Sequence, residues 1–195
     1  MNHRFAALAA LIFSLSACNV GDPPAEPPLA GARIGGPFTL VDQNGAQRAE
    51  SSFAGRYRIV YFGYTYCPDV CPVDVANIAS GLKAFEAKDP ARGRQVVPIF
   101  ITADPARDTP AVLKAFVANF HPRLVGLTGS TAAIDAAAKA HAVYIRRGEV
   151  QPGGGYLVDH SRAAYLMDPA GKPIALLPAE QGGEQVAAEL DKWVR

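Results

Sequence analysis

A short apolar run followed at once by two closely spaced cysteines constrains this chain more than any other feature. Residues 59–63 have the composition of a buried β-strand, and Cys67 and Cys71 follow them. Apolar residues then recur at helical spacing over residues 75–85. A strand that leads directly into a helix is typical of open α/β sheets, in which sites lie at the carboxyl ends of the strands. The pattern therefore predicts two thiols at such an edge.

The spacing of the two cysteines favours thiolate chemistry. If the helical register extends back from Val75, Cys71 and Cys67 lie on one face, at the positive end of the helix dipole. That environment lowers the pKa of a thiol, and the thiolate is the form that attacks disulfides and binds soft metal ions such as Cu(I). A disulfide across so short a loop would stabilise the fold little, because this effect grows with loop length. Chemistry therefore explains the pair better than a structural crosslink does.

The N-terminal residues predict export and a lipid anchor. A basic residue precedes a short apolar run, and residues 15–18 read Leu-Ser-Ala-Cys, which resembles a bacterial lipobox. We expect a lipoprotein signal peptide over residues 1–17 and a lipid on Cys18 that anchors the chain to a membrane. An ordinary signal peptide with a chance cysteine is the alternative. With Cys18 acylated, the three cysteines of the chain leave only the Cys67 and Cys71 pair.

The remainder of the chain divides into a tether and one domain. Residues 18–35 are rich in Pro and Gly and indicate an extended tether, and residues 36–195 have the length of one domain. Loss of the signal peptide leaves equal numbers of basic and acidic side chains, which gives no argument for nucleic acid binding. The expected location is the bacterial cell envelope, with the domain facing the periplasm or the cell exterior.

The domain pattern alternates strands and helices. An Asn-Gly turn predicts a hairpin over residues 38–50. Further predicted strands cover residues 58–63, 96–101, 143–145, 163–167 and 174–177, and predicted helices cover about 72–88, 109–120, 130–140 and 183–193. This alternation predicts an α/β fold with a central, mostly parallel sheet flanked by helices and an N-terminal β-hairpin extension. With paired cysteines where the first core strand meets its helix, the order is similar to the thioredoxin fold.

Four histidines could supply a further metal ligand. His3 would be lost with the signal peptide, and His121 and His141 lie at element ends where capping or solvent exposure is expected. His160 differs, because in a thioredoxin topology the residue before the strand at 163–167 faces the active-site cysteines. Oxidoreductases of that fold usually carry a proline at this turn, and this sequence has none there. An ordinary surface-loop histidine is the alternative interpretation.

Three segments in the same order resemble the Sco/SenC family of copper chaperones. They are Cys67-Pro68-Asp69-Val70-Cys71-Pro72, Asp104-Pro105-Ala106-Arg107-Asp108-Thr109-Pro110 and Tyr156-Leu157-Val158-Asp159-His160-Ser161. The resemblance covers roughly residues 36–195 and implies a thioredoxin-like, membrane-tethered domain. It also implies a copper ion, Cu(I) with Cu(II) left open, held by Cys67, Cys71 and His160. Asp159 is interpreted either as a group that orients His160 or as a cap of its loop.

The same resemblance implies a role in assembling the binuclear copper centre of cytochrome c oxidase, with the subunit II copper site as partner. The first alternative is a thiol–disulfide oxidoreductase that cycles Cys67 and Cys71 to reduce the cysteines of that site. A thiol peroxidase is the second, for which Thr65 is a faint hint. Three residues between the cysteines, against two in redox thioredoxins, favour a metallochaperone over an enzyme. The residues do not separate copper delivery from reduction, because the same thiols would perform both.

Overall fold

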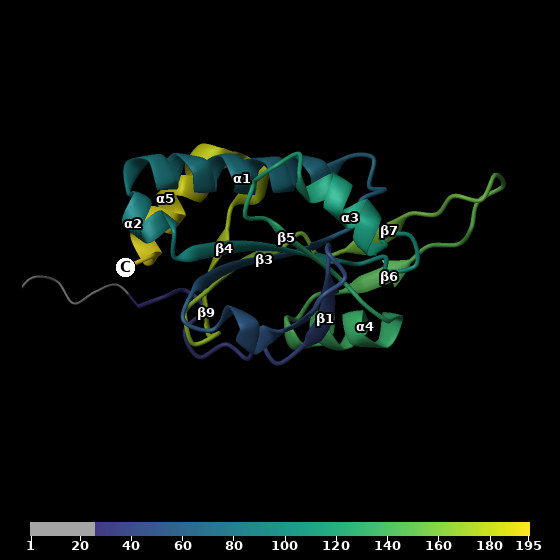
Figure 1. Ribbon diagram of the computed structural model, residues 1–195, viewed down its shortest axis with the longest axis horizontal. Helices are drawn as coiled ribbons and strands as arrows, with labels where there is room; N and C mark the ends of the chain where they lie inside the picture. Colours follow the sequence, from purple (N-terminus) through teal and green to yellow (C-terminus); the bar gives the residue numbers. More distant parts are fainter. Residues whose placement is uncertain (1–25) are drawn as a thin grey trace, which may run out of the picture.

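In the computed structural model, which describes residues 26–195, a seven-stranded sheet lies between two layers of helices (Figure 1). Along the chain the elements are β1 (Thr39–Asp42), β2 (Gln47–Ala49), η1 (Glu50–Phe53), β3 (Tyr57–Gly63), α1 (Val70–Lys88), α2 (Pro90–Gly93), β4 (Val96–Thr102), α3 (Pro110–Val117), β5 (Val125–Thr128), α4 (Thr131–Ala140), β6 (Ile145–Arg147), β7 (Val158–His160), β8 (Ala164–Met167), β9 (Pro173–Leu177), η2 (Ala179–Gln181) and α5 (Gly183–Trp193). The predicted signal peptide and Cys18 lie outside the described residues.

The sheet has the strand order β2-β1-β5-β4-β3-β8-β9. Its three central strands, β5, β4 and β3, run parallel, because helices return the chain to the start of each next strand. The hairpin of β1 and β2 closes one edge, and β8 and β9 add antiparallel strands at the other. The predicted α/β fold, with its parallel centre and N-terminal hairpin, is confirmed.

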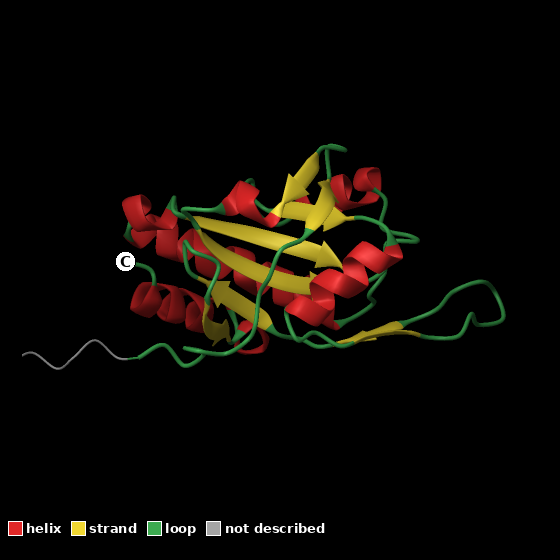
Figure 2. Ribbon diagram, turned by 90° about the horizontal axis from the view of Figure 1, so that it is seen from below, coloured by secondary structure: helices red, strands yellow, loops and turns green. Residues whose placement is uncertain are grey.

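Strands β3 and β4 are buried along their whole length, which explains their continuous apolar runs. Alternate side chains of β3 enter two separate clusters. Ile59 and Tyr61 pack beneath α1 and α5, whereas Val60 and Phe62 pack on the opposite face toward α4. Figure 2 views the molecule from the side of α4, with the strands of the sheet running behind that helix and the loops. The sheet therefore has a hydrophobic core on each face.

Part of the expected tether lies against the domain. Leu29 and Ile34 pack on the cluster beneath α4, and the Leu29 N–H donates to the Ile174 carbonyl at 3.0 Å. The Gly35 N–H donates to the Ala140 carbonyl at 2.8 Å. The domain boundary at residue 36 stays a prediction, but these contacts begin before it.

Several short elements differ from the expected ones. The strand β5 and the helical turn α2 were not predicted, and β6 begins at Ile145 rather than at 143. His160 ends the short strand β7, where a loop was expected. These strands have three or four residues each and gain their hydrogen bonds from partners distant in sequence, so local pattern does not reveal them.

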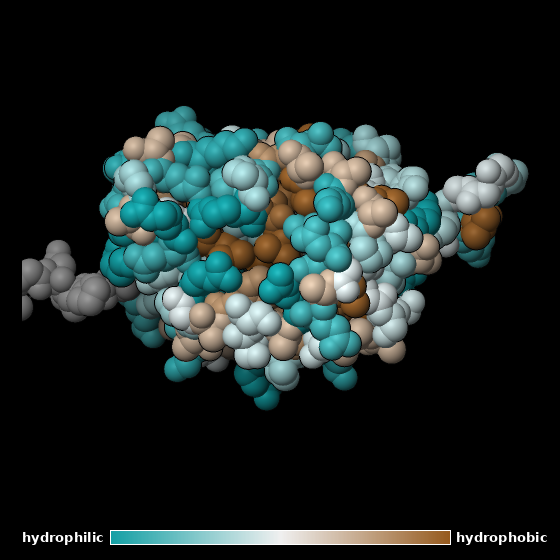
Figure 3. All heavy atoms as spheres, viewed as in Figure 1, coloured by the Kyte–Doolittle hydropathy of each residue, from teal (hydrophilic) through white to brown (hydrophobic). Residues whose placement is uncertain are grey.

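The carboxyl ends of β3 and β4, the start of α1 and the β6–β7 hairpin meet at one end of the molecule (right in Figure 1). The loop between β6 and β7 projects beyond that end, and an apolar side chain stands out on it in Figure 3. Val150 of this loop is 68% exposed. No helix within residues 26–195 is long and apolar enough to cross a membrane.

Candidate metal centre

The two cysteines lie where β3 passes into α1. Cys71 occupies the first turn of the helix and is fully buried, and Cys67 lies in the preceding loop and is partly exposed. The helical register begins at Val70 and so does not include Cys67. The Cys71 N–H nevertheless donates to the Cys67 Sγ atom at 3.4 Å. The positive end of the helix therefore faces that sulfur, and both thiols are free.

The two thiols differ in acidity. Burial works against ionisation of Cys67, but hydrogen bonds from the N–H groups of Cys71, Asp69 and Val70 and from the Cys71 thiol outweigh it and lower the Cys67 pKa. Burial raises the pKa of Cys71, and the neighbouring charges of Cys67 and Asp74 raise it further. Cys67 is therefore the thiol that ionises first, and Cys71 keeps its proton.

His160 completes the cluster from the end of β7. Its Nε2 atom lies 3.1 Å from the Cys71 Sγ atom, and its Nδ1 atom lies 3.0 Å from the Ser161 carbonyl oxygen. Because a carbonyl oxygen only accepts, Nδ1 carries the proton and the Nε2 lone pair points at the sulfur. Burial lowers the pKa of His160. A neutral imidazole with a free Nε2 is the form that binds a metal ion.

Two tyrosines fix the plane of that ring. Tyr61 and Tyr64 both meet the His160 ring edge-on, with ring centroids 6.2 and 6.1 Å away. Tyr64 also belongs to the small apolar cluster around Cys71, with Ala103 and Val158. The sulfur and the imidazole thus share one largely apolar environment at the sheet edge.

The donors fit a soft metal ion, although they do not yet surround a single point. Two sulfurs and one imidazole nitrogen are the ligand types that Cu(I) prefers. Across residues 26–195, no group of three His, Cys, Asp or Glu side chains forms a ready-made metal site. One ion could therefore be held by Cys67, Cys71 and His160 only after at least one of these side chains moves.

Asp159 points away from this cluster. Its carboxylate accepts two hydrogen bonds from Arg146, at 2.6 and 3.1 Å, and both side chains are exposed. The hydrogen-bond partner of His160 is Ser161 instead. The charge of Asp159 still favours the protonated form of His160 from a distance. The proposed orienting role of Asp159 stays a prediction.

The other two described histidines lie far from solvent. His121 is 3% exposed and His141 is 2% exposed, so the expected solvent exposure is wrong for both. The capping role of His141 is confirmed, because it caps α4 and its Nδ1 atom lies 2.8 Å from the Ala137 carbonyl oxygen. Burial lowers the pKa of each imidazole.

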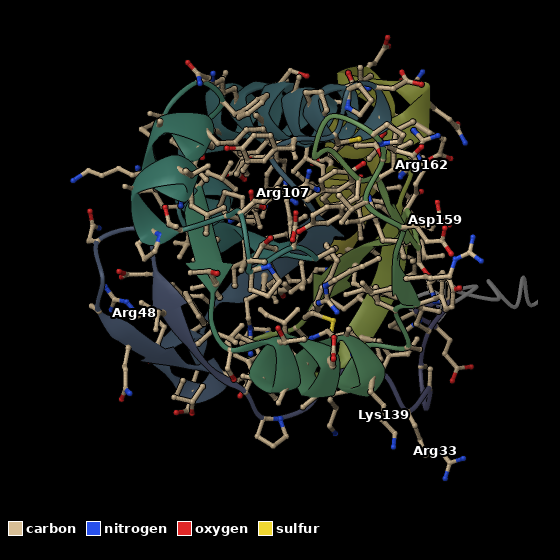
Figure 4. All side chains as sticks on the ribbon, turned by 90° about the vertical axis from the view of Figure 1, so that its right-hand side faces the viewer. Arg33, Arg48, Arg107, Lys139, Asp159 and Arg162 are labelled. Atoms are coloured by element: carbon tan, nitrogen blue, oxygen red, sulfur yellow. The ribbon has the colours of Figure 1, made fainter. Side chains whose placement is uncertain are left out.

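Sequence reasoning missed the side chains that join the segments of the site. Arg107 lies over the Tyr156 ring, 3.7 Å from its centroid, and also over Tyr66 at 5.0 Å. Its guanidinium is paired with the buried Asp104, which accepts a hydrogen bond from the Tyr156 hydroxyl at 2.7 Å. Figure 4 views this end, with Arg107 near the middle and with Arg162 and Asp159 beside β7. The Asp104–Arg107 pair lies within the second of the three segments that resemble the family, and that resemblance is the feature of the sequence that could have indicated it.

Comparison with known proteins supplies the family. The SCO1/SenC family model matches residues 26–195. Protein SenC of Rhodobacter capsulatus is 46% identical over 141 residues, which cover 72% of this chain and 61% of SenC. The chain spans about half the length of the curated relatives it matches, for example 54% of mitochondrial SCO2 of Saccharomyces cerevisiae.

Solved structures agree in fold. The copper-bound structure of Bradyrhizobium japonicum ScoI has 38% identity and a TM-score of 0.73, and covers 82% of this chain and 99% of that one. A second similar structure is that of BsSco, a member of the Sco family of cytochrome c oxidase assembly proteins in which a disulfide switch is identified. It has 25% identity and a TM-score of 0.65, and the match covers 82% of this chain and 92% of BsSco. The thioredoxin-like fold expected from the sequence is therefore confirmed, and this chain belongs to the SCO1/SenC family.

Proposed function

We propose that this protein binds copper through Cys67, Cys71 and His160 and uses it to assemble the copper centre of cytochrome c oxidase. The observation that carries the proposal is the contact between His160 Nε2 and Cys71 Sγ at 3.1 Å, beside a second thiol of lowered pKa. The copper in a related ScoI structure supports it. Copper is the cargo in this function, and the acceptor is the subunit II copper site.

The same proposal includes a membrane tether. Lipidation of Cys18 would hold the domain at a membrane of the bacterial envelope, on the periplasmic or outer side. The described chain begins at the end of the molecule opposite the cysteines (Figure 1). An anchor on Cys18 would therefore join the domain at the end away from the copper site.

The copper test compares the two redox states of one protein. Reduced protein should retain one Cu(I) per chain after desalting, measured by native mass spectrometry. Protein oxidised to the Cys67–Cys71 disulfide should retain none, because the disulfide removes both thiolate ligands and one imidazole holds Cu(I) weakly. Stoichiometric copper on the oxidised protein would count decisively against this site.

Thiol–disulfide exchange is the second candidate function, and the unequal acidity of the thiols favours it. The Cys67 thiolate would attack a disulfide of the acceptor and release one acceptor thiolate. Cys71 would then lose its proton and attack the Cys67 sulfur, which releases the second acceptor thiolate and leaves Cys67 and Cys71 oxidised. The acceptor gains the two electrons that the pair loses. The disulfide switch described for BsSco supports this chemistry.

Transfer to a defined acceptor separates the two functions. A chaperone should metallate the reduced, copper-free subunit II domain, whereas a reductase should act only on its oxidised form and need no metal. We expect copper transfer to the reduced domain, because a dithiol reductase has no need of His160. Efficient disulfide reduction without copper transfer would favour the oxidoreductase.

A further inference from the structure

A single buried carboxylate joins the segments that surround the proposed copper ligands. Asp74 follows Cys71 by one turn of α1 and is 1% exposed. Its Oδ2 atom accepts hydrogen bonds from the Tyr61 hydroxyl at 2.8 Å and from Arg162 Nε at 3.0 Å. Its Oδ1 atom accepts one from Arg162 Nη2 at 2.6 Å. Asp74 thus connects α1, β3 and the chain just after β7.

Both hydrogen-bond partners of Asp74 constrain the position of His160. Arg162 is two residues beyond His160, so its bidentate contact fixes the backbone that follows the imidazole. Tyr61 meets the His160 ring edge-on, with centroids 6.2 Å apart. The helix that carries Cys71 therefore determines, through Asp74, where the imidazole lies.

We propose that Asp74 and Arg162 are positioning residues that hold His160 Nε2 beside Cys71 Sγ in the copper site. This inference rests on the copper function proposed above. A bidentate Arg–carboxylate pair fixes distance and orientation together, which a general hydrophobic contact does not. A buried carboxylate, even when it is paired, also gives less stability than apolar packing of the same volume, so stability alone gives little reason for Asp74 here.

The chain contains a matched control beside the same histidine. Arg146 pairs with Asp159, which directly precedes His160, but these side chains are 69% and 58% exposed. Exposed pairs of this kind hold their partners weakly. The buried Asp74 and the exposed Asp159 thus give two Asp–Arg pairs that flank one ligand and differ mainly in burial. Only the Asp74 pair reaches the helix of Cys71.

Binding of Cu(I) and binding of Cu(II) should change differently when the Asp74–Arg162 pair no longer positions His160. Cu(I) is satisfied by two thiolates, whereas Cu(II) prefers nitrogen and oxygen donors and depends more on the imidazole. Loss of Arg162 should therefore weaken Cu(II) binding while Cu(I) remains on Cys67 and Cys71. A general loss of protein stability would weaken the binding of both ions alike.

The test uses the full chain with Arg162→Gln, the conservative Arg162→Lys and the control Arg146→Gln. Arg162 is 44% exposed, so its replacement opens no core cavity, and Asp74 keeps the hydrogen bond from the Tyr61 hydroxyl. With Cu(II) as the probe, Arg162→Gln should lose metal to a chelator about tenfold faster than the parent and shift the thiolate-to-Cu(II) absorption band. Arg162→Lys should lose Cu(II) at an intermediate rate, and the rate for Arg146→Gln should stay within about twofold of the parent. Cu(I) retention should not change.

A second measurement needs no metal. In the reduced copper-free protein, nuclear Overhauser contacts between the rings of His160 and Tyr61 should be present in the parent and in Arg146→Gln, and lost in Arg162→Gln. Contacts that survive in Arg162→Gln, or Cu(II) retention there within twofold of the parent, would overturn the inference. If the parent binds no copper, the proposed function fails, and the ring contacts alone decide whether the pair positions His160.

Discussion

Replacing Asp108 by alanine should destabilise the copper-free protein by about 3 kcal/mol, because its carboxylate ties the cysteine loop to the end of β4. Asp108 is fully buried. It accepts hydrogen bonds from the Thr65 N–H at 3.1 Å, from the Thr65 hydroxyl at 2.6 Å and from the Thr102 hydroxyl at 2.6 Å. Thr65 lies two residues before Cys67, so this contact also sets the course of the loop.

The magnitude follows from these three bonds. A buried N–H left without an acceptor costs about 1–3 kcal/mol, and each hydroxyl that loses an ionised acceptor costs about 1 kcal/mol after it turns to another partner. Removing the carboxylate recovers part of its desolvation cost, since burial raises the pKa of Asp108. The net loss of about 3 kcal/mol corresponds to a melting temperature lower by about 6–12 °C.

Denaturant unfolding of the reduced protein at pH 7 measures this loss, with two variants as controls. Asp108→Asn keeps the shape and an acceptor oxygen, and it should cost about 1 kcal/mol because only one donor then meets an amide N–H. Asp135→Ala, at a half-exposed carboxylate, should cost less than about 0.5 kcal/mol. A loss below about 1 kcal/mol for Asp108→Ala, or equal losses for the alanine and asparagine variants, would refute the reasoning.

Three further predictions concern the ligand, the anchor and pH. His160→Ala should fold normally and lose Cu(II) about 10–100 times faster than His141→Phe, measured by chelator competition; equal loss in both would make the ligand assignment wrong. Cys18→Ala should move the protein from the membrane fraction to the soluble fraction on cell fractionation, unless an uncleaved signal segment holds it, and a fully processed, membrane-bound variant would contradict the lipid anchor. Burial lowers the pKa of His141 in the fold, so the unfolded chain binds the proton more readily and stability should fall as pH drops below about 6.5. His141→Phe should reduce that fall between pH 7.5 and pH 5, followed by urea midpoints, and an unchanged pH dependence would exclude His141 as its source.

Local pattern was enough to predict the part of the fold that bears the cysteines. The apolar run of β3 and the stripe of α1 are signals within single elements, and they place Cys67 and Cys71 at the sheet edge without tertiary information. Strands β5 and β7 carry no such signal, because they are too short and depend on pairing with β4 and β6.

The supporting side chains could not be predicted for a similar reason. Asp74 and Arg162 lie 88 positions apart, and neither stands out until the fold brings α1 beside the chain after β7. Of the two alternatives expected for His141, capping is correct and exposure is not, because the C-cap of α4 turns inward, where the imidazole packs near Phe38 and Phe62. A cap position says where a residue lies along a helix, but not which side of that end the core covers.

The charge of the proposed site explains why one arrangement suits both copper and disulfides. The Cys67 pKa is lowered, the Cys71 pKa is raised and the His160 pKa is lowered, so the first ionisation of the reduced cluster gives it one negative charge, on Cys67. A Cu(I) ion bound to two thiolates and a neutral imidazole carries the same charge, so binding exchanges one proton of Cys71 for the metal ion. No additional charge is then buried in the apolar surroundings of Cys71, which oppose a second free thiolate. The disulfide form is neutral and equally compatible with those surroundings, but it offers copper no thiolate.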